Sequence, residues 1–144
     1  MDSFLSFLVK SPFNVVLFGV VVASGGMLLW PLVSRVFLRS NEVGTFEAVQ
    51  LINRRDAVVV DVRETGDFAS GHIANARHIP EAQFRDRVGE LDKFKARPII
   101  VSCRSGTRAP VVVTDLRKRG FQEVAALRGG IAAWQQAGMP LAKN

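Results

Sequence analysis

The sequence predicts an α/β domain with a mainly parallel sheet, preceded by one transmembrane helix. From about residue 45 onward, short runs of β-branched residues alternate with stretches of helical period. Strands that alternate with helices are typical of a parallel sheet, because each parallel connection needs a long crossover. In addition, 24 uncharged residues lie between Lys10 and Arg35. That length is sufficient to cross a bilayer, which needs about 20 predominantly apolar residues.

The composition divides the chain at about residue 40. The first 40 residues hold 24 apolar and four charged residues, whereas the other 104 hold sixteen basic and twelve acidic ones. We therefore expect an N-terminal membrane anchor at 1–40, with a transmembrane helix over about 13–34, and one soluble domain at 41–144. The total of 144 residues leaves little room for a second soluble domain.

A cleaved secretory signal is the alternative interpretation of the apolar run. Such a signal has a basic start, an apolar core of about 7–15 residues and a small-x-small site after the core. Here Asp2 precedes the first Lys, and Ala23-Ser24-Gly25 lies inside the run. Membrane lipid is thus an expected partner of the helix. More Lys and Arg follow the helix than precede it, which favours a single-pass protein with its C-terminal domain in the cytoplasm.

The first element of the soluble domain is a predicted helix that begins near Thr45. Phe46, Val49 and Ile52, together with Ala48 and Leu51, form one apolar face, and Thr45 is placed to cap the helix.

Three buried strands and two further helices follow. The predicted strands are the apolar runs 57–60, 98–102 and 123–127, whose lack of alternation is typical of strands buried on both faces. The predicted helices surround Phe84, Val88 and Leu91, and then residues 112–116, with Gly120 as a C-terminal stop.

Cys103 is the only cysteine, and it lies directly after the second predicted strand. One cysteine excludes an intramolecular disulfide and a CxxC redox or zinc motif. The segment Cys103-Arg104-Ser105-Gly106-Thr107-Arg108 joins this strand to the next helix. In a parallel sheet, ligands bind at the carboxyl ends of the strands. Free N–H groups and the helix dipole attract an anion there and favour the thiolate.

The residues around the thiol point to an anionic substrate. Arg104 and Arg108 are placed to steer it, and Gly106 allows the backbone to turn tightly. A buried, inert cysteine that opens an ordinary turn is the alternative. The basic residues of the domain are spread along the chain, with Arg117-Lys118-Arg119 the longest run. Their number does not argue for nucleic acid, and this run is expected to mark the end of a helix.

The soluble domain resembles a single-domain rhodanese, a sulfurtransferase module, from about Thr45 to Leu141. The matching segments, besides the cysteine loop, are Asp61-Val62-Arg63-Glu64, Phe68, Gly71-His72-Ile73, Ala76, Ile79-Pro80, Gly120-Phe121, Val124, Leu127-Arg128-Gly129-Gly130 and Trp134. The resemblance implies a three-layer rhodanese-like fold with a central, mainly parallel sheet flanked by helices. It is the number of matches at family-like spacing that makes the resemblance specific.

The resemblance also implies a reaction. Cys103 is the expected catalytic nucleophile, which takes sulfane sulfur from a donor such as thiosulfate, holds it as a persulfide and passes it to a thiol or to cyanide. Arg104, Ser105, Gly106, Thr107 and Arg108 are the expected substrate-binding residues. Neither a metal nor an organic cofactor is implied. The alternative within the family is a persulfide carrier or regulatory protein-binding module with little thiosulfate turnover.

Loop length argues against a cysteine-dependent phosphatase, which resembles this family. Phosphatases of that kind carry a Cys-x5-Arg loop, which would place arginine at position 109. This chain has Ala109 there and Arg108 one residue earlier. The shorter ring of amides suits a sulfur atom better than a phosphate group.

The remaining polar residues are expected to be structural. His72 and His78 are too few, with one cysteine, for a zinc site of four ligands. Asp61 and Arg63 are interpreted as a buried pair that holds the loops together. Gly129-Gly130 is expected to form a turn, with a possible place in the cavity wall, and Trp134 to be part of the core.

Overall fold

The computed structural model describes residue 6, residues 11–37 and residues 41–143. The chain divides into two compact units, Met1–Arg39 and Ser40–Asn144, and each is described by itself.

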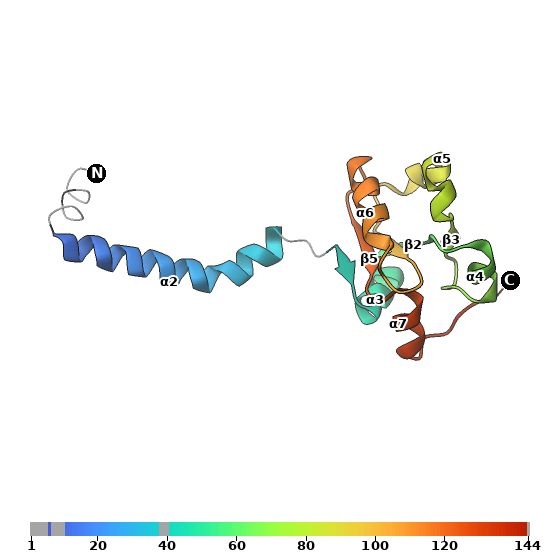
Figure 1. Cartoon of the computed structure of the whole chain (residues 1–144), viewed down its shortest axis with the longest axis horizontal. Coiled ribbons are helices and arrows are strands. Elements are labelled where there is room, and N and C mark those ends of the chain that lie inside the picture. Colours follow the sequence, from blue (N-terminus) through green and yellow to red (C-terminus); the bar gives the residue numbers. More distant parts are fainter. Residues whose placement is uncertain (1–5, 7–10, 38–40, 144) are drawn as a thin grey trace. The chain divides into compact units, whose positions relative to one another are not determined.

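The N-terminal unit contains one long helix, α2, over Pro12–Phe37 (Figure 1). Its segment Pro12–Trp30 has a mean hydropathy of 2.0, and none of it is buried inside the protein. Its apolar side chains, among them Leu17, Val20 and Met27, are exposed. The transmembrane helix predicted at 13–34 lies within α2, which by length and composition could cross a membrane. A signal sequence near the N-terminus would meet the same criteria.

The second unit is built on a five-stranded sheet in which all strand pairs are parallel. The strand order is β1-β5-β4-β2-β3, with β1 at Glu42–Val43, β2 at Val58–Asp61, β3 at Arg77–His78, β4 at Ile99–Ser102 and β5 at Val124–Leu127. The three predicted strands are the three central ones. The edge strands β1 and β3 were not predicted, because two residues are too short to show a pattern.

Helices cover both faces of the sheet and make the three-layer α/β fold that the sequence predicts (Figure 1). On one face lie α3 at Thr45–Arg55 and α7 at Gly130–Gln136, and on the other lie α5 at Phe84–Arg87, η2 at Val88–Phe94 and α6 at Ala109–Lys118. The short α4 at Thr65–Ser70 and η1 at Glu81–Gln83 follow β2 and β3.

Strand β2 shows why its sequence is apolar without interruption. Val58 and Val60 pack into the core with α5, η2 and α6, whereas Val59 between them packs into the core with α3 and α7. Successive side chains of a strand point to opposite faces, so a strand covered on both sides needs apolar residues at every position. The same alternation in β4 carries Val101 and Cys103 to the α6 side of the sheet.

Two predictions for the first helix of this unit were wrong. Phe46 is 77% exposed, whereas Ala48 is buried. Two residues correspond to about 200° around a helix, so these side chains lie on opposite sides of α3. The cap residue is Gly44, without a side-chain hydrogen bond, and Thr45 is already helical. The end of α6 at Lys118 agrees with the expected place of the Arg117-Lys118-Arg119 run.

Candidate functional site

Cys103 lies at the carboxyl end of β4, and only 4% of its surface is exposed. Its Sγ accepts a hydrogen bond from the backbone N–H of Gly106, at 3.0 Å. The loop that makes this bond possible runs from Cys103 to Arg108, the cap residue of α6. Gly106 has a φ of +87°, a backbone conformation that side chains with a Cβ rarely adopt.

The first turn of α7 holds the other side of this loop. The N–H of Ile131 donates to the carbonyl oxygen of Cys103 at 2.9 Å, and that of Ala132 donates to the carbonyl oxygen of Arg104 at 3.2 Å. The predicted turn at Gly129-Gly130 begins this helix, with both residues at positive φ. The sequence suggests a possible place for this turn in the cavity wall. Instead, the turn supports the cysteine loop, and neither glycine lines the cavity.

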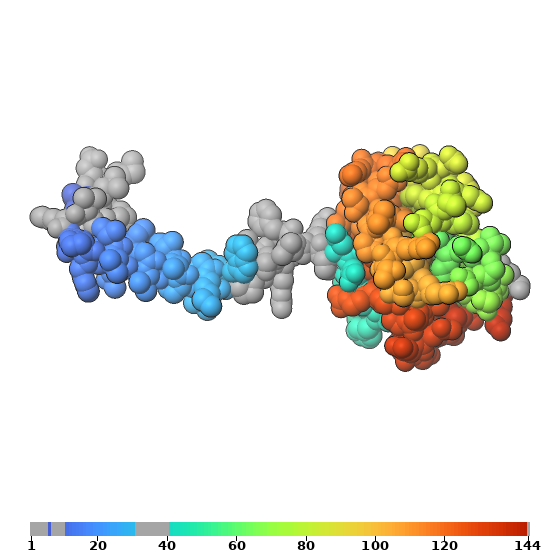
Figure 2. Space-filling model, in the orientation of Figure 1, coloured from blue at the N-terminus to red at the C-terminus, as the bar shows by residue number. Residues whose placement is uncertain are grey.

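A cavity of about 940 Å³ opens above Cys103. It lies where the segments that follow β2, β3 and β4 meet, and Figure 2 shows these segments side by side on the surface as the green, yellow-green and orange regions. Its lining residues are Val62, Arg63, Glu64, Asp67, Pro80, Glu81, Ala82, Cys103, Arg104, Ser105, Thr107 and Arg108. The cavity is much larger than a small inorganic anion.

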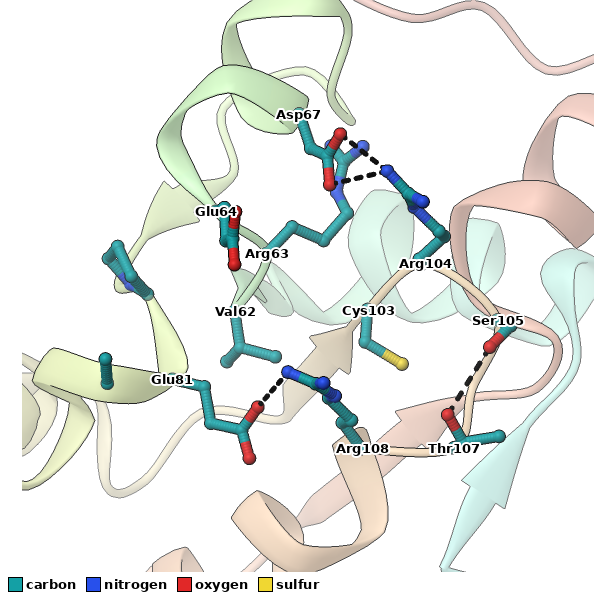
Figure 3. A pocket seen from close by; sticks show the side chains of 12 residues that line it. Val62, Arg63, Glu64, Asp67, Glu81, Cys103, Arg104, Ser105, Thr107 and Arg108 are labelled. Carbon is teal, nitrogen blue, oxygen red and sulfur yellow. Dashed lines mark hydrogen bonds and ion pairs between the residues drawn. The ribbon is translucent and has the colours of Figure 1, made fainter.

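Both arginines of the loop form ion pairs across the cavity (Figure 3). Arg104 Nη2 donates to the Asp67 carboxylate at 2.8 and 2.9 Å, and Arg108 Nη1 donates to Glu81 Oε2 at 3.0 Å. The two arginine side chains are 76% and 71% exposed. A substrate anion therefore competes with a carboxylate for each guanidinium. The hydroxyl groups of Ser105 and Thr107 form a hydrogen bond with each other, with their oxygens 3.4 Å apart.

Asp61 and Arg63 form the buried ion pair that the sequence predicted. The distance from Arg63 Nη2 to Asp61 Oδ2 is 2.7 Å, and the side chains are 8% and 1% exposed, respectively. The same Arg63 nitrogen donates to the carbonyl oxygen of Gly71 at 2.7 Å, and the Arg63 backbone N–H donates to Asp61 Oδ1. This pair fixes the chain between β2 and Gly71, and with it one wall of the cavity.

The two histidines are part of that wall's packing, not of the cavity lining. Their rings stack on the two sides of Phe68, with centroid distances of 3.9 Å for His72 and 4.3 Å for His78. One ring nitrogen of His72 is 2.9 Å from the Phe68 carbonyl oxygen, and one of His78 is 2.8 Å from that of Arg63. This arrangement agrees with the structural interpretation of both residues. Trp134 is likewise buried in the core.

The structure brings five of the six predicted site residues to the cavity wall: Cys103, Arg104, Ser105, Thr107 and Arg108. Gly106 contributes its N–H group to Sγ instead. The sequence analysis missed the carboxylates of Glu64, Asp67 and Glu81. The only clue to these residues in the sequence was their position. They follow β2 and β3 at the same end of the sheet at which Cys103 follows β4.

Comparison with known proteins matches residues 46–137 to the model of the rhodanese-like domain. The uncharacterized protein YibN of Escherichia coli strain K12 is 41% identical over 99 residues, which cover 68% of this chain and 69% of that protein. The thiosulfate sulfurtransferase GlpE of Coxiella burnetii is 35% identical over 94 residues, with coverages of 65% and 86%.

Two solved structures share the fold. The rhodanese-like domain protein from Staphylococcus aureus has a TM-score of 0.62 at 28% identity, and the match covers 72% of this chain and 97% of that one. Thiosulfate sulfurtransferase from Pseudomonas aeruginosa has a TM-score of 0.63 at 30% identity, over 71% of this chain and 20% of that one. The residues matched to the family model, 46–137, include the whole cysteine loop and all the residues that line the cavity.

Proposed function

The chain belongs to the rhodanese-like domain family, and from this premise we propose that it is a membrane-anchored sulfurtransferase that works through a persulfide on Cys103. The observation that carries the proposal is the geometry of the thiol. Cys103 lies at the floor of an open cavity, its sulfur accepts a backbone N–H bond, and two arginines flank it. Nucleophilic transfer requires a nucleophilic sulfur and a place where the donor can bind, and the thiol with the cavity above it supports both.

In the first half-reaction, the Cys103 thiolate attacks the sulfane sulfur of a donor such as thiosulfate. A new S–S bond forms at Cys103 while the S–S bond of thiosulfate breaks, and sulfite leaves with the electron pair of that bond. The total charge does not change. Arg104 and Arg108 bind the oxygens of the donor through charge-assisted hydrogen bonds. The Gly106 N–H, already directed at Sγ, stabilises the anionic sulfur.

In the second half-reaction, an acceptor thiolate attacks the outer sulfur of the persulfide. The acceptor leaves as a persulfide, and Cys103 is regenerated as the thiolate. Because this chain has one cysteine, the acceptor thiol must come from another molecule. The reaction therefore proceeds by two successive displacements with a covalent intermediate between them.

The direct test is the mass of the intact protein after incubation with thiosulfate. We expect a gain of about 32 Da, one sulfur atom, located on Cys103 and removed by a small thiol. A protein that stays at its original mass with thiosulfate and with other persulfide donors contradicts the proposal.

A second candidate function is supported by the ion pairs of the cavity. Asp67 and Glu81 occupy both loop arginines, and Glu64 adds a third carboxylate to the lining. These charges disfavour a small dianion and suit sulfur delivery from a protein persulfide, so the chain is then a carrier or a regulatory module. Slow loading from thiosulfate, combined with rapid loading from a protein persulfide, distinguishes this function from the first.

We propose further that α2 is the membrane anchor and that residues 41–144 form a cytoplasmic domain. The exposed apolar surface of α2 and the Lys and Arg residues after it support this proposal. The test uses Lys143→Cys in a Cys103→Ser background and a thiol reagent that cannot cross membranes. Labelling only after the membrane is permeabilised is expected, and labelling in intact cells contradicts a cytoplasmic domain.

A further inference from the structure

The positive charge of the soluble unit is concentrated at the amino end of its sheet. Nine exposed or partly exposed basic residues precede the strands, begin a strand or lie at the helix ends that lead into the strands: Arg54, Arg55, Arg77, Lys93, Lys95, Arg97, Arg117, Lys118 and Arg119. We call this set the basic face. The acidic residues among them are Asp56, Asp92, Asp115 and Glu123. The rest of residues 41–144 carries seven basic and eight acidic residues, so the net charge of the domain comes from this one face.

The topology produces this concentration. All strand pairs are parallel, so every segment that enters a strand arrives at the same end of the sheet. The basic residues are far apart in the sequence, but they lie on segments that enter four different strands at that end. The Cys103 cavity is formed by segments that leave β2, β3 and β4, and therefore lies at the opposite end.

Four residues of the basic face lie over two aromatic rings. Arg77, Lys93 and Arg97 lie over the ring of Phe94, with distances of 4.7, 5.1 and 5.2 Å to its centroid. Lys95 lies over the ring of Phe121, at 5.6 Å from its centroid.

Further contacts join the strands across this end of the sheet. Arg97 donates to the carbonyl oxygen of Asp56 before β2, and Arg55 binds Glu123 before β5. Three of the four acidic residues are in ion pairs with the face's own Arg or Lys residues, so six of its nine cations have no ion pair among the described residues.

Favourable interaction with helix dipoles explains only part of the set. Arg54, Arg55, Arg117 and Lys118 lie in the last turns of α3 and α6, where positive charge stabilises a helix. Arg77 is in β3, and Arg97 lies between η2 and β4. A helix dipole does not account for these two, which share the Phe94 ring.

The basic face is also the end at which the chain enters from the anchor. Arg117 donates hydrogen bonds to the side chain of Asn41 and to the carbonyl oxygen of Val124. β1 begins at Glu42, and α2 ends at Phe37. The four residues between these two elements span at most about 18 Å, counting both connecting bonds. A chain anchored by α2 therefore enters the soluble unit at its basic face and not at the Cys103 cavity.

We propose that the basic face binds anionic lipid headgroups and turns the Cys103 cavity away from the membrane. The proposal rests on the anchoring role of α2 proposed above, but not on sulfur transfer. Anionic lipid gives a cytoplasmic membrane surface a negative potential, which attracts Lys and Arg residues within about 10 Å. A cavity at the far end of the sheet stays open to acceptors in solution.

The test uses residues 41–144 without the anchor. Ser40–Asn144 is a compact unit by itself, and the Staphylococcus aureus chain, 97% of which the match covers, holds little besides this domain. Binding is measured by sedimentation with vesicles of phosphatidylcholine and phosphatidylglycerol, and with vesicles of phosphatidylcholine alone. We expect binding to the first kind only, and loss of that binding in high salt.

Two variants with the same net charge separate a specific face from overall charge. The first carries Arg77→Gln, Lys93→Gln, Lys95→Gln and Arg97→Gln. The control carries Arg85→Gln, Arg87→Gln, Arg128→Gln and Lys143→Gln, all outside the basic face. We expect the first to lose at least about tenfold in vesicle partitioning, since each basic residue near a lipid surface contributes severalfold, and the control to lose less than about threefold.

Three results overturn the proposal: equal losses in both variants, equal binding to both kinds of vesicle, or tighter binding to a short DNA duplex than to anionic vesicles. Thermal unfolding of each variant establishes that it is folded. Sulfur loading is measured in the same samples. A domain that loads sulfur without binding vesicles contradicts only the lipid proposal, and one that binds vesicles without loading contradicts only the sulfurtransferase proposal.

Discussion

Gly130 lies directly against the backbone of Cys103: a Cβ atom placed on Gly130 would come within 2.2 Å of the Cys103 carbonyl oxygen. No real Cβ contact is this short, so any other residue at this position must move the loop. Gly106 makes the reciprocal contact, since its Cβ would lie 2.9 Å from the nitrogen of Gly129. The cysteine loop and the start of α7 are therefore a single packed unit that depends on glycine on both sides.

Replacement of Gly130 by Ala is expected to disturb the cysteine loop. Strain at φ +59° and the clash with backbone atoms add, and we expect a loss of about 3 kcal/mol in the free energy of unfolding and slower sulfur loading. The control is Gly138→Ala, because Gly138 has a φ of +74° but open space around it. That variant should lose only about 1 kcal/mol and keep its loading rate. Urea unfolding and intact mass measure the two quantities, and equal effects in both variants would contradict the packing argument.

Replacement of Cys103 by Ser is expected to abolish sulfur loading and to leave the fold intact. The hydroxyl is nearly isosteric and can accept the same N–H bond from Gly106, but it is a far weaker nucleophile at neutral pH. The free energy of unfolding should change by about 1 kcal/mol or less. Mass spectrometry with thiosulfate and a thermal melt check the two expectations. Loading that persists in a folded variant places the nucleophile elsewhere.

Removal of a carboxylate from the cavity is expected to improve use of thiosulfate. In Asp67→Asn and Glu81→Gln, the partner arginine is released to the donor, and one repelling charge disappears. Exposed ion pairs are worth up to about 1 kcal/mol, so we expect the KM for thiosulfate to fall about two- to fivefold. The matched control is Asp115→Asn, which breaks the Arg119–Asp115 pair away from the cavity. An unchanged or higher KM in both cavity variants, measured with saturating acceptor, contradicts this role of the pairs.

The central strands and the cysteine loop were predictable because their signals are local. Uninterrupted valines mark β2, and the six-residue segment after β4 contains its own nucleophile, turn glycine and cations. The carboxylates that bind Arg104 and Arg108 were not predictable in this way. Asp67 and Glu81 lie 37 and 27 residues from their partners in the sequence, and residue spacing does not indicate contacts over such separations.

The basic face was not predictable from the sequence for the same physical reason. Along the sequence its charges are diluted among acidic residues, and only Arg117-Lys118-Arg119 forms a run. Parallel topology collects them at one end of the sheet, a property of strand order and not of composition. Phe46 shows the converse error, since an apolar residue at nearly helical spacing was assigned to the buried side of α3 and is exposed.

Replacement of Ser102 by Ala is expected to leave stability unchanged or to raise it by up to about 1 kcal/mol. Ser102 is fully buried at the end of β4, and its Oγ has no hydrogen-bond partner among the residues that the structure describes. A buried hydroxyl without a partner costs free energy, which the methyl group of Ala does not. The variant Ser102→Val tests whether the buried site has space for a larger apolar side chain. A loss of more than about 1 kcal/mol in Ser102→Ala, measured by urea unfolding, would show that the hydroxyl has a stabilising partner.

Replacement of Asp61 by Asn is expected to destabilise the domain by about 3 kcal/mol. The change leaves the Arg63 guanidinium buried without its counter-charge, although its bond to the Gly71 carbonyl oxygen remains. The double variant Asp61→Asn with Arg63→Met removes both charges and should lose less than the sum of the two single variants. Exposed Arg87→Met, which breaks the Arg87–Glu90 pair, is the control and should change stability by less than about 1 kcal/mol. If the losses of the two single variants simply add, Asp61 and Arg63 act independently, and the wall of the cavity depends on some other contact.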